Sequence, residues 1–205
     1  MLKKAKEKLE LGNYLHRVVE IREAILPFLP FQDQAFDAII MNQVLHHLEL
    51  DADGEHFPTI QKTVAEMYRV LKPGGVVIIT NTVKDQFYGT WFCRLIPTVL
   101  ERLVKRVPSK DVIIDILRNC DFDVETPLSY LGNDWFKDYS DTEGPLIESW
   151  RMRDSFFSLA SAEEIRTCIE RVQTMQANGT LKSFYEEHDG TSSIGTFSFF
   201  VALKK

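Results

Sequence analysis

The chain has 205 residues, of which 44% are hydrophobic and 26% are charged. That length and balance are ordinary for a globular protein with one sizeable core, so we expect a single domain over residues 1–205. The net charge of −6 disfavours nucleic-acid binding, because phosphate contacts require clustered lysine and arginine side chains.

The cysteines and the longest apolar runs indicate the cellular location of the chain. Cys93, Cys120 and Cys168 are far apart and odd in number, so we expect neither a disulfide framework nor a metal site, and a reducing, cytoplasmic location suits them. No apolar run approaches membrane-spanning length and the N-terminus is charged, so we expect neither membrane insertion nor export.

The first predicted elements are a helix, a short strand and a loop. Residues 1–11 place apolar side chains at helical spacing, and Gly12 offers a stop. This helix opens without a capping residue, which suggests that the sequence was cut from something longer. Residues 18–21 (VVEI) predict a strand, and the two prolines of ILPFLPF predict a packed loop after it.

Two apolar runs joined by a helix organise the fold. Residues 36–41 (FDAIIM) are typical of a buried strand, and this run ends at Asn42. Residues 57–71 place apolar side chains at helical spacing, and LKPGG ends that helix in an expected turn. Residues 76–80 (VVIIT) form a second buried run. Strand, helix and strand in this order form the unit of a parallel sheet, so the carboxyl ends of both strands should meet at one rim.

Downstream of this unit the predicted elements are less regular. Residues 81–88 are polar and predict a loop, whereas residues 91–104 predict a strongly apolar helix that is either core or a lid. Residues 109–119 predict another amphipathic helix. Residues 122–130 alternate loosely, which predicts a strand.

The C-terminal part combines an insertion, a capped helix and a strand. Residues 131–160 are rich in aromatic and charged side chains and predict an irregular insertion. Its aromatic residues include Trp135, Phe136, Tyr139, Trp150, Phe156 and Phe157. Ser161 and Glu164 form a capping box at the start of a helix, and residues 196–203 (TFSFFVAL) predict the final strand.

The alternation of strands and helices predicts an α/β fold, with a mostly parallel sheet covered by helices on both faces. In such sheets, ligands bind outside the carboxyl ends of the strands. LKPGG lies at the opposite edge, so the segments expected near a ligand are residues 20–24, 41–43 and 80–83.

With these segments placed, the chain resembles the class I methyltransferases that use S-adenosylmethionine, especially those acting on small molecules. The matching stretches are LPFQDQAFDAIIMNQVLHHL and AEMYRVLKPGGVVIIT, while DFDVETPLSY and GTFSFFVAL resemble the last two strands of that family. The resemblance implies a Rossmann-like sheet, mostly parallel with an antiparallel last strand, and S-adenosylmethionine as cofactor.

The chain departs from the family at its N-terminus. The family's glycine-rich turn after its first strand, and the acidic residue that closes its second strand, have no counterpart here, and MLKKAKEKLE resembles the helix that follows that acid. We therefore expect an N-terminally truncated version of the fold. The lost contacts should reduce cofactor affinity severely, and the lost strands should leave one sheet edge unpaired.

The resemblance assigns four residues to the cofactor. Glu23 and Ala24 match the acidic and small pair that meets the adenine, although a solvated loop acid is an equal alternative for Glu23. Asn42 and Gln43 match the strand-end positions where a backbone carbonyl and amide meet the methionine moiety.

The residues that would bind the methyl acceptor, the molecule that receives the methyl group, are less clearly indicated. Tyr88 and Trp91 follow the fifth strand of the family, where they would line an acceptor pocket or cover the sulfonium, with core packing an equal alternative for Trp91. A general base at His46 or His47 is disfavoured against packing, because transfer from an activated sulfonium mainly requires proximity and alignment. No catalytic residue and no metal ligand is therefore assigned.

The sequence leaves three functions open. The first is an S-adenosylmethionine-dependent methyltransferase with a small-molecule acceptor, active or inactivated by the absent N-terminal motif. The second is a non-catalytic remnant that binds a protein partner or another copy through the exposed sheet edge. The third, a nucleotide-sugar or dinucleotide enzyme, also lacks its glycine fingerprint.

Overall fold

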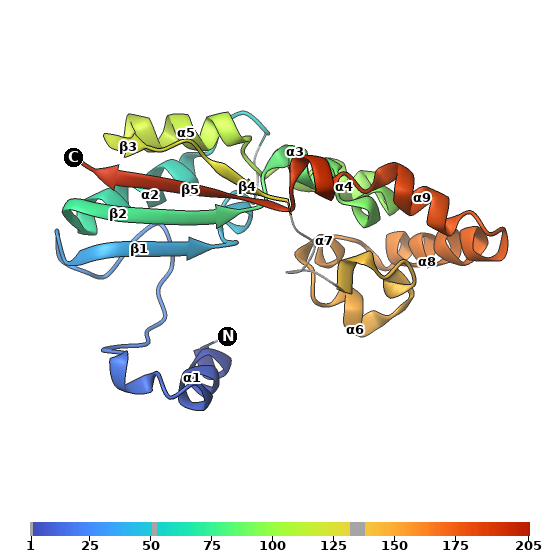
Figure 1. The fold of residues 1–205 in the computed structure, drawn as a ribbon, viewed down its shortest axis with the longest axis horizontal. Coiled ribbons are helices and arrows are strands. Elements are labelled where there is room, and N and C mark those ends of the chain that lie inside the picture. Colours follow the sequence, from blue (N-terminus) through green and yellow to red (C-terminus); the bar gives the residue numbers. More distant parts are fainter. Residues whose placement is uncertain (1, 51–52, 132–137) are drawn as a thin grey trace.

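The computed structural model describes residues 2–50, 53–131 and 138–205. Figure 1 shows a sheet with helices packed against it and a helical lobe beyond one end of the strands. Trp135 and Phe136 of the predicted insertion lie outside the described residues. Among the described helices, none has the length and apolar character needed to cross a membrane.

The described strands form one five-stranded sheet in the order β1-β2-β5-β3, with β4 also paired to β5. The strands are β1 (Phe36–Asn42), β2 (Leu71–Asn81), β3 (Phe122–Val124), β4 (Leu128–Tyr130) and β5 (Phe197–Lys204). β1 and β2 are parallel, whereas β5 is antiparallel to β2, β3 and β4. The predicted α/β sheet with a reversed last strand is confirmed, although the strand predicted over residues 122–130 is divided into β3 and β4.

The carboxyl ends of β1 and β2 meet at one rim, as predicted. Asn42 lies opposite Thr80 in the parallel register. The Thr80 hydroxyl donates a hydrogen bond to Asn42 Oδ1 at 2.6 Å. This contact fixes the two strand ends side by side.

LKPGG forms the bulged beginning of β2 rather than a separate turn. Helix α2 (Pro58–Val70) is followed at once by the ladder to β1, in which Phe36 lies opposite Leu71. The next pair that keeps the regular register involves Val76, so the residues between bulge out of the ladder. Gly74, at φ +74°, adopts the backbone conformation that this irregularity requires. The local sequence predicted a turn instead, because it does not reveal that Leu71 pairs with the distant Phe36.

Helices cover one face of the sheet. Helices α2 and α5 (Lys110–Asn119) pack on this face, and the core beneath them includes Met41, Ile60, Val64, Val77, Ile79, Ile113, Leu117, Phe200 and Ala202. On the opposite face, Ile40 is 74% exposed. Helix α1 (Leu2–Leu11) buries no residue and lies apart from the sheet in Figure 1. The expectation of helices on both faces is therefore wrong for the described residues.

Two local predictions also fail. Residues 18–21 form no strand, and Val19 is fully exposed. An apolar run becomes a strand only where a neighbouring strand accepts its hydrogen bonds. Just upstream lies the short 3₁₀ helix η1 (Leu15–Arg17). The loop predicted over residues 81–88 contains helix α3 (Lys84–Tyr88).

The helical lobe begins with two short helices where the sequence predicted one continuous helix. The helix predicted over residues 91–104 is divided into the 3₁₀ helix η3 (Trp91–Leu95) and α4 (Pro97–Lys105). Pro97 explains the break, because proline fits the first turn of a helix but interrupts a helix that precedes it.

The remaining lobe elements follow residue 138. They are η5 (Gly144–Leu146), α6 (Glu148–Arg151), α7 (Ser155–Ser158), α8 (Ala162–Ala177), α9 (Leu181–His188) and α10 (Thr191–Ile194). The capping box of α8 is confirmed, since Ser161 N donates to Glu164 Oε2 at 2.8 Å and Glu164 N donates to Ser161 Oγ at 3.2 Å. Trp150, Phe156 and Phe157 do not form a core of their own, because they join the side chains of η3, α4, α8 and α9 in one cluster.

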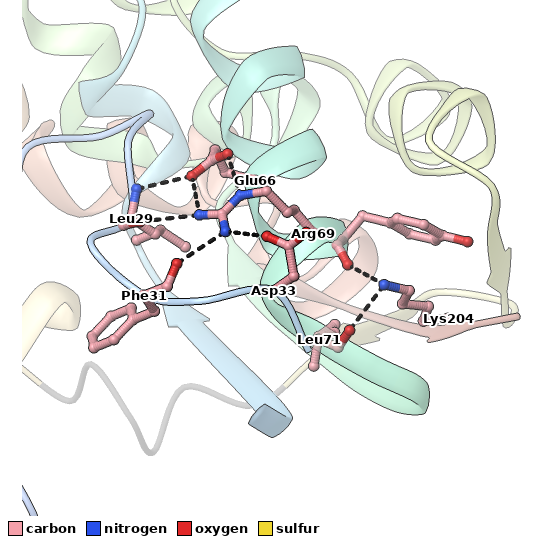
Figure 2. Close-up of polar contacts among 8 residues, drawn as sticks. Leu29, Phe31, Asp33, Glu66, Arg69, Leu71 and Lys204 are labelled. Atoms are coloured by element: carbon pink, nitrogen blue, oxygen red, sulfur yellow. Dashed lines mark hydrogen bonds and ion pairs between the residues drawn. The ribbon is translucent and has the colours of Figure 1, made fainter. Parts of the chain in front are cut away.

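Arg69, in the last turn of α2, holds the ILPFLPF loop at the amino end of β1 (Figure 2). Its guanidinium donates to the carbonyl oxygens of Leu29 at 3.1 Å and Phe31 at 2.9 Å. It also pairs with Asp33 at 2.7 Å and with Glu66 at 2.8 Å. Glu66 in turn accepts the Leu29 amide at 3.1 Å. This set of contacts, the Arg69 latch, fixes the path by which the chain enters β1.

Lys204 secures the same helix from the end of β5 (Figure 2). Its ammonium donates to the carbonyl oxygens of Tyr68 at 2.6 Å and Leu71 at 2.9 Å. A positive charge at the C-terminal end of a helix is favourable, so this contact ties α2 to the sheet.

We expect Arg69→Met to lower the free energy of unfolding by about 2 kcal/mol, because two carbonyls and two carboxylates lose their donor.

Arg69 beside Glu66 holds the pKa of that carboxyl at about 2, below its ordinary value of 4.5. The latch is therefore complete above pH 4.5, and its contribution is lost as the pH falls through 2. Urea titrations between pH 2 and pH 7 measure both effects. Arg166→Met is the matched control, since Arg166 is 66% exposed and lies 3.7 Å from Glu163; equal losses in the two variants would refute the latch.

Candidate functional site

A cavity of about 260 Å³ lies between the sheet rim and the helical lobe. Its rim side is formed by residues that follow β1 and β2 or precede β5. These are Gln43, His46, His47, Thr82 and Thr196. Its lobe side is contributed mainly by aromatic residues and by the connection between α6 and α7. The position matches the rule that ligands of such sheets bind beyond the carboxyl ends of the strands.

The rim is held in place by polar contacts from β2. Gln43 has a positive φ of 53°, and its backbone amide donates to Thr80 O at 2.8 Å. The Gln43 side-chain oxygen accepts the Thr82 amide at 3.2 Å. Asn81 is fully buried, and its Oδ1 accepts the Leu45 amide at 3.2 Å, which anchors the 3₁₀ helix η2 (Leu45–His47). The histidines of η2 are thereby directed to the rim.

Five aromatic rings form the apolar wall. They belong to Phe87, Trp91, Phe92, Tyr139 and Tyr185. Phe92 contacts Tyr139 edge-on at 5.0 Å between ring centroids, and Trp91 contacts Tyr185 at 5.6 Å. Edge-to-face contacts of this kind hold each ring in a fixed orientation, so the wall is preformed.

A polar wall joins η2 to the start of α7. Asp154 caps α7, accepting the Phe156 amide at 2.8 Å, and its other oxygen accepts the Tyr139 hydroxyl at 2.7 Å. His46 Nε2 lies 3.4 Å from Ser155 Oγ, and the rings of His46 and His47 are 4.0 Å apart. The cavity therefore carries ionisable groups next to aromatic ones.

Burial dominates the electrostatics of this wall. Burial, with His47 beside it, lowers the pKa of His46 to about 4. Burial also lowers the pKa of His47, although the Asp154 carboxylate opposes the shift. The pKa of Asp154 is raised, again by burial. Near pH 7 both imidazoles are neutral.

Among the sequence-predicted residues, Gln43 and Trp91 are brought together in the cavity. Trp91 is also core, because it is 1% exposed and its indole N–H donates to Tyr139 O at 2.6 Å. Asn42 lies at the rim, exposed and bonded to Thr80, without lining the cavity. Tyr88 does not line it either, since its ring packs against the Arg94 guanidinium at 5.2 Å.

Glu23 and Ala24 are exposed and lie in an unpaired segment. Neither lines the cavity, so their assignment stays a prediction.

Thr82 lies in the segment 80–83 that was expected near a ligand, whereas the sequence assigned no role to Asp154 or Ser155. No local pattern distinguishes Asp154 from other loop acids. Its proximity to η2 arises only from the packing of the lobe.

Residues 1–79 match a family described as the methyltransferase domain. A demethylmenaquinone methyltransferase of Desulfitobacterium hafniense is 35% identical over 103 residues, which cover 47% of this chain and 37% of that protein. Over this part, the chain is similar to methyltransferases. The resemblance inferred from the sequence is thus confirmed.

A second relative is similar in sequence over nearly the same length. A ubiquinone/menaquinone biosynthesis C-methyltransferase UbiE of Brucella canis is 29% identical over 106 residues, 49% of this chain and 36% of that protein. The chain thus spans little more than a third of the length of these two relatives.

Solved structures show the same fold. A protein of Anabaena variabilis, described as a methyltransferase from an antibiotic biosynthesis pathway, superimposes with a TM-score of 0.68 at 20% identity, covering 87% of this chain and 70% of that one. A Galdieria sulphuraria protein described as a sarcosine dimethylglycine methyltransferase gives a TM-score of 0.55 at 18% identity, covering 99% and 65%.

Proposed function

We propose that this chain is an S-adenosylmethionine-dependent methyltransferase whose acceptor is a small molecule bound in the cavity. The observation that carries the proposal is the register of β1 and β2, which sets Asn42 opposite Thr80 at a shared rim, with Gln43 next to it in the cavity that the aromatic wall lines. The methyltransferase relatives support it.

The rim residues fit one end of the methyl donor. The exposed Asn42 side chain and the side-chain amide of Gln43 would hold the methionine end. The backbone amide of Gln43, expected to bind there, is already bonded to Thr80. Glu23 and Ala24 remain the proposed partners of the adenine, and their exposure leaves both free to contact it.

When bound, the donor supplies a methyl group already activated on a sulfonium, so the chain's own task is to position the acceptor and exclude water. The five-ring wall would bind a flat apolar acceptor and keep water from it. Trp91 is the wall residue that the sequence assigned to the acceptor, whereas Tyr88 packs against Arg94 and does not line the cavity.

Calorimetric titration of the full chain with S-adenosylmethionine tests the proposal. We expect saturable heat with a dissociation constant up to about 1 mM, equivalent to about 4 kcal/mol of binding free energy. Asn42→Ala should weaken binding about 5-fold through the loss of one hydrogen bond. Asn178→Ala, an exposed residue that ends α8, is the matched control. No heat at millimolar donor would refute the assignment.

One observation favours a second, non-catalytic function. β1 is the edge of the described sheet, and Ile40 on its open face is 74% exposed. An unpaired edge with an apolar face can add a strand from a protein partner or from a second copy of this chain. The absence of donor binding, together with concentration-dependent dimerisation in sedimentation velocity, would favour this alternative.

A further inference from the structure

In the polar wall, His47 is accessible to the cavity that Asp154 also lines. The side chain lines the cavity and remains accessible to it, whereas His46 is only 8% exposed and packs against His47 and Phe87. Asp154 lines the same cavity and is held by the Tyr139 hydroxyl and the Phe156 amide. A fixed carboxylate near a neutral imidazole favours the imidazolium form.

We propose that His47 accepts the proton that the acceptor loses during methyl transfer, that the charge of Asp154 on the same cavity wall stabilises the imidazolium so formed, and that the acceptor is an uncharged aromatic hydroxyl compound. This inference rests on the proposed function. The acceptor O–H bond breaks, its proton moves to a His47 ring nitrogen, and the oxygen electron pair forms the bond to the methyl carbon. The carbon–sulfur bond breaks at the same time, with its electron pair remaining on sulfur.

The class of acceptor follows from the cavity. A dry cavity of about 150 Å³ accommodates a single benzene ring. The cavity of about 260 Å³ therefore suits a substituted ring or two fused rings. Five aromatic side chains favour a flat molecule, as described above.

The charged groups that face His47 disfavour an anionic acceptor. Arg153 lines the cavity but forms an ion pair with Asp138. Asp189 also lines it and accepts hydrogen bonds from the hydroxyls of Thr191 and Tyr185. Among the described residues, the other titratable groups that line the cavity are His46, Tyr139, Asp154 and Tyr185, and an added negative charge would lie close to two carboxylates.

Binding can be tested without any methyl donor. Imidazole resonances of the full chain are followed by NMR as 1-naphthol or 1-methoxynaphthalene is added. We expect 1-naphthol to shift the His47 resonances and to bind at least 5-fold more weakly to His47→Gln. The methoxy compound, which has no proton to donate, should bind wild type and variant equally. Equal behaviour of both probes, or no shift at His47, would overturn the inference.

The role of Asp154 has its own readout. Asp154→Asn keeps a capping oxygen for α7 but removes the charge, so we expect the pKa of His47 to fall, and Asp154→Glu should restore it. A merely structural Asp154 would leave the His47 titration unchanged in both variants.

Transfer assays with radiolabelled donor and 1-naphthol separate this inference from the proposed function. His47→Gln should lower kcat at least 100-fold, a far larger effect than the weaker binding of 1-naphthol, and the wild-type rate should fall as the pH drops below the pKa of His47. His56→Gln is the control, since His56 pairs with Asp53 at the surface and does not line the cavity. If transfer proceeds and His47→Gln retains it within 3-fold, this inference is wrong while the function stands. If NMR binding holds but no chain transfers methyl, the function fails and the proton-acceptor role fails with it, leaving only the binding site.

Discussion

Phe92→Ala should lower the free energy of unfolding by about 4 kcal/mol, the range found for a fully buried phenylalanine. Phe92 is 1% exposed and lies at the centre of the lobe core. Its ring contacts those of Trp91, Tyr139, Trp150, Phe156 and Phe157. Truncation leaves a void among rings that are fixed by one another and cannot collapse into it. Urea unfolding followed by tryptophan fluorescence measures the loss.

Phe28→Ala is the matched control, because it is the same substitution at a residue that is 76% exposed. We expect a change below about 0.5 kcal/mol there, as for most surface substitutions. Phe92→Leu keeps most of the volume and should fall between the two, which provides a measurement if the alanine variant does not fold. A loss below 1 kcal/mol in Phe92→Ala would contradict the described lobe core.

Glu49→Ala should lower the free energy of unfolding by about 3 kcal/mol, because two charge-assisted hydrogen bonds are lost in a buried setting. Glu49 is 5% exposed, and its Oε1 accepts the amides of Thr59 at 2.6 Å and Ile60 at 2.9 Å. These amides belong to the first turn of α2, where a carboxylate is also favoured by the helix dipole. Glu49 follows His47 by two residues, so the cap also ties the rim histidines to α2.

Glu49→Gln separates the hydrogen bonds from the charge. The amide oxygen can still accept both N–H groups, so we expect about half of the loss seen with alanine. Glu55→Ala is the control, because Glu55 is a nearby exposed acid. If Glu49→Ala and Glu55→Ala unfold at the same urea concentration, Glu49 is not the cap of α2.

Features set by neighbouring residues were predictable from the sequence. The capping box of Ser161 and Glu164 and the helix that became α2 depend on spacings of a few residues, and both were found as predicted. The common rim of β1 and β2 was also predictable, because a strand, helix and strand in this order favour a parallel pair with a right-handed crossover. Pro97 should have divided the helix over residues 91–104, since its effect is local too.

Features that depend on distant partners were not predictable. Residues 18–21 have the composition of a strand, but no described strand pairs with them. The bulge at LKPGG depends on Phe36, and the cap of α2 comes from Glu49 outside the helix. In the candidate site, Gln43 and Trp91 were named from the resemblance, whereas Asp154 reaches the cavity through packing of the lobe and has no signature in its own segment.

The central claim is that the methyl donor binds at the rim formed by β1 and β2, beside the aromatic cavity. Backbone amide NMR of the full chain during titration with S-adenosylhomocysteine tests it most directly. The account predicts that shifts concentrate at residues 41–43 and 80–82 and extend to His47. Saturable shifts confined to other parts of the chain, or no shifts at millimolar ligand, would contradict it.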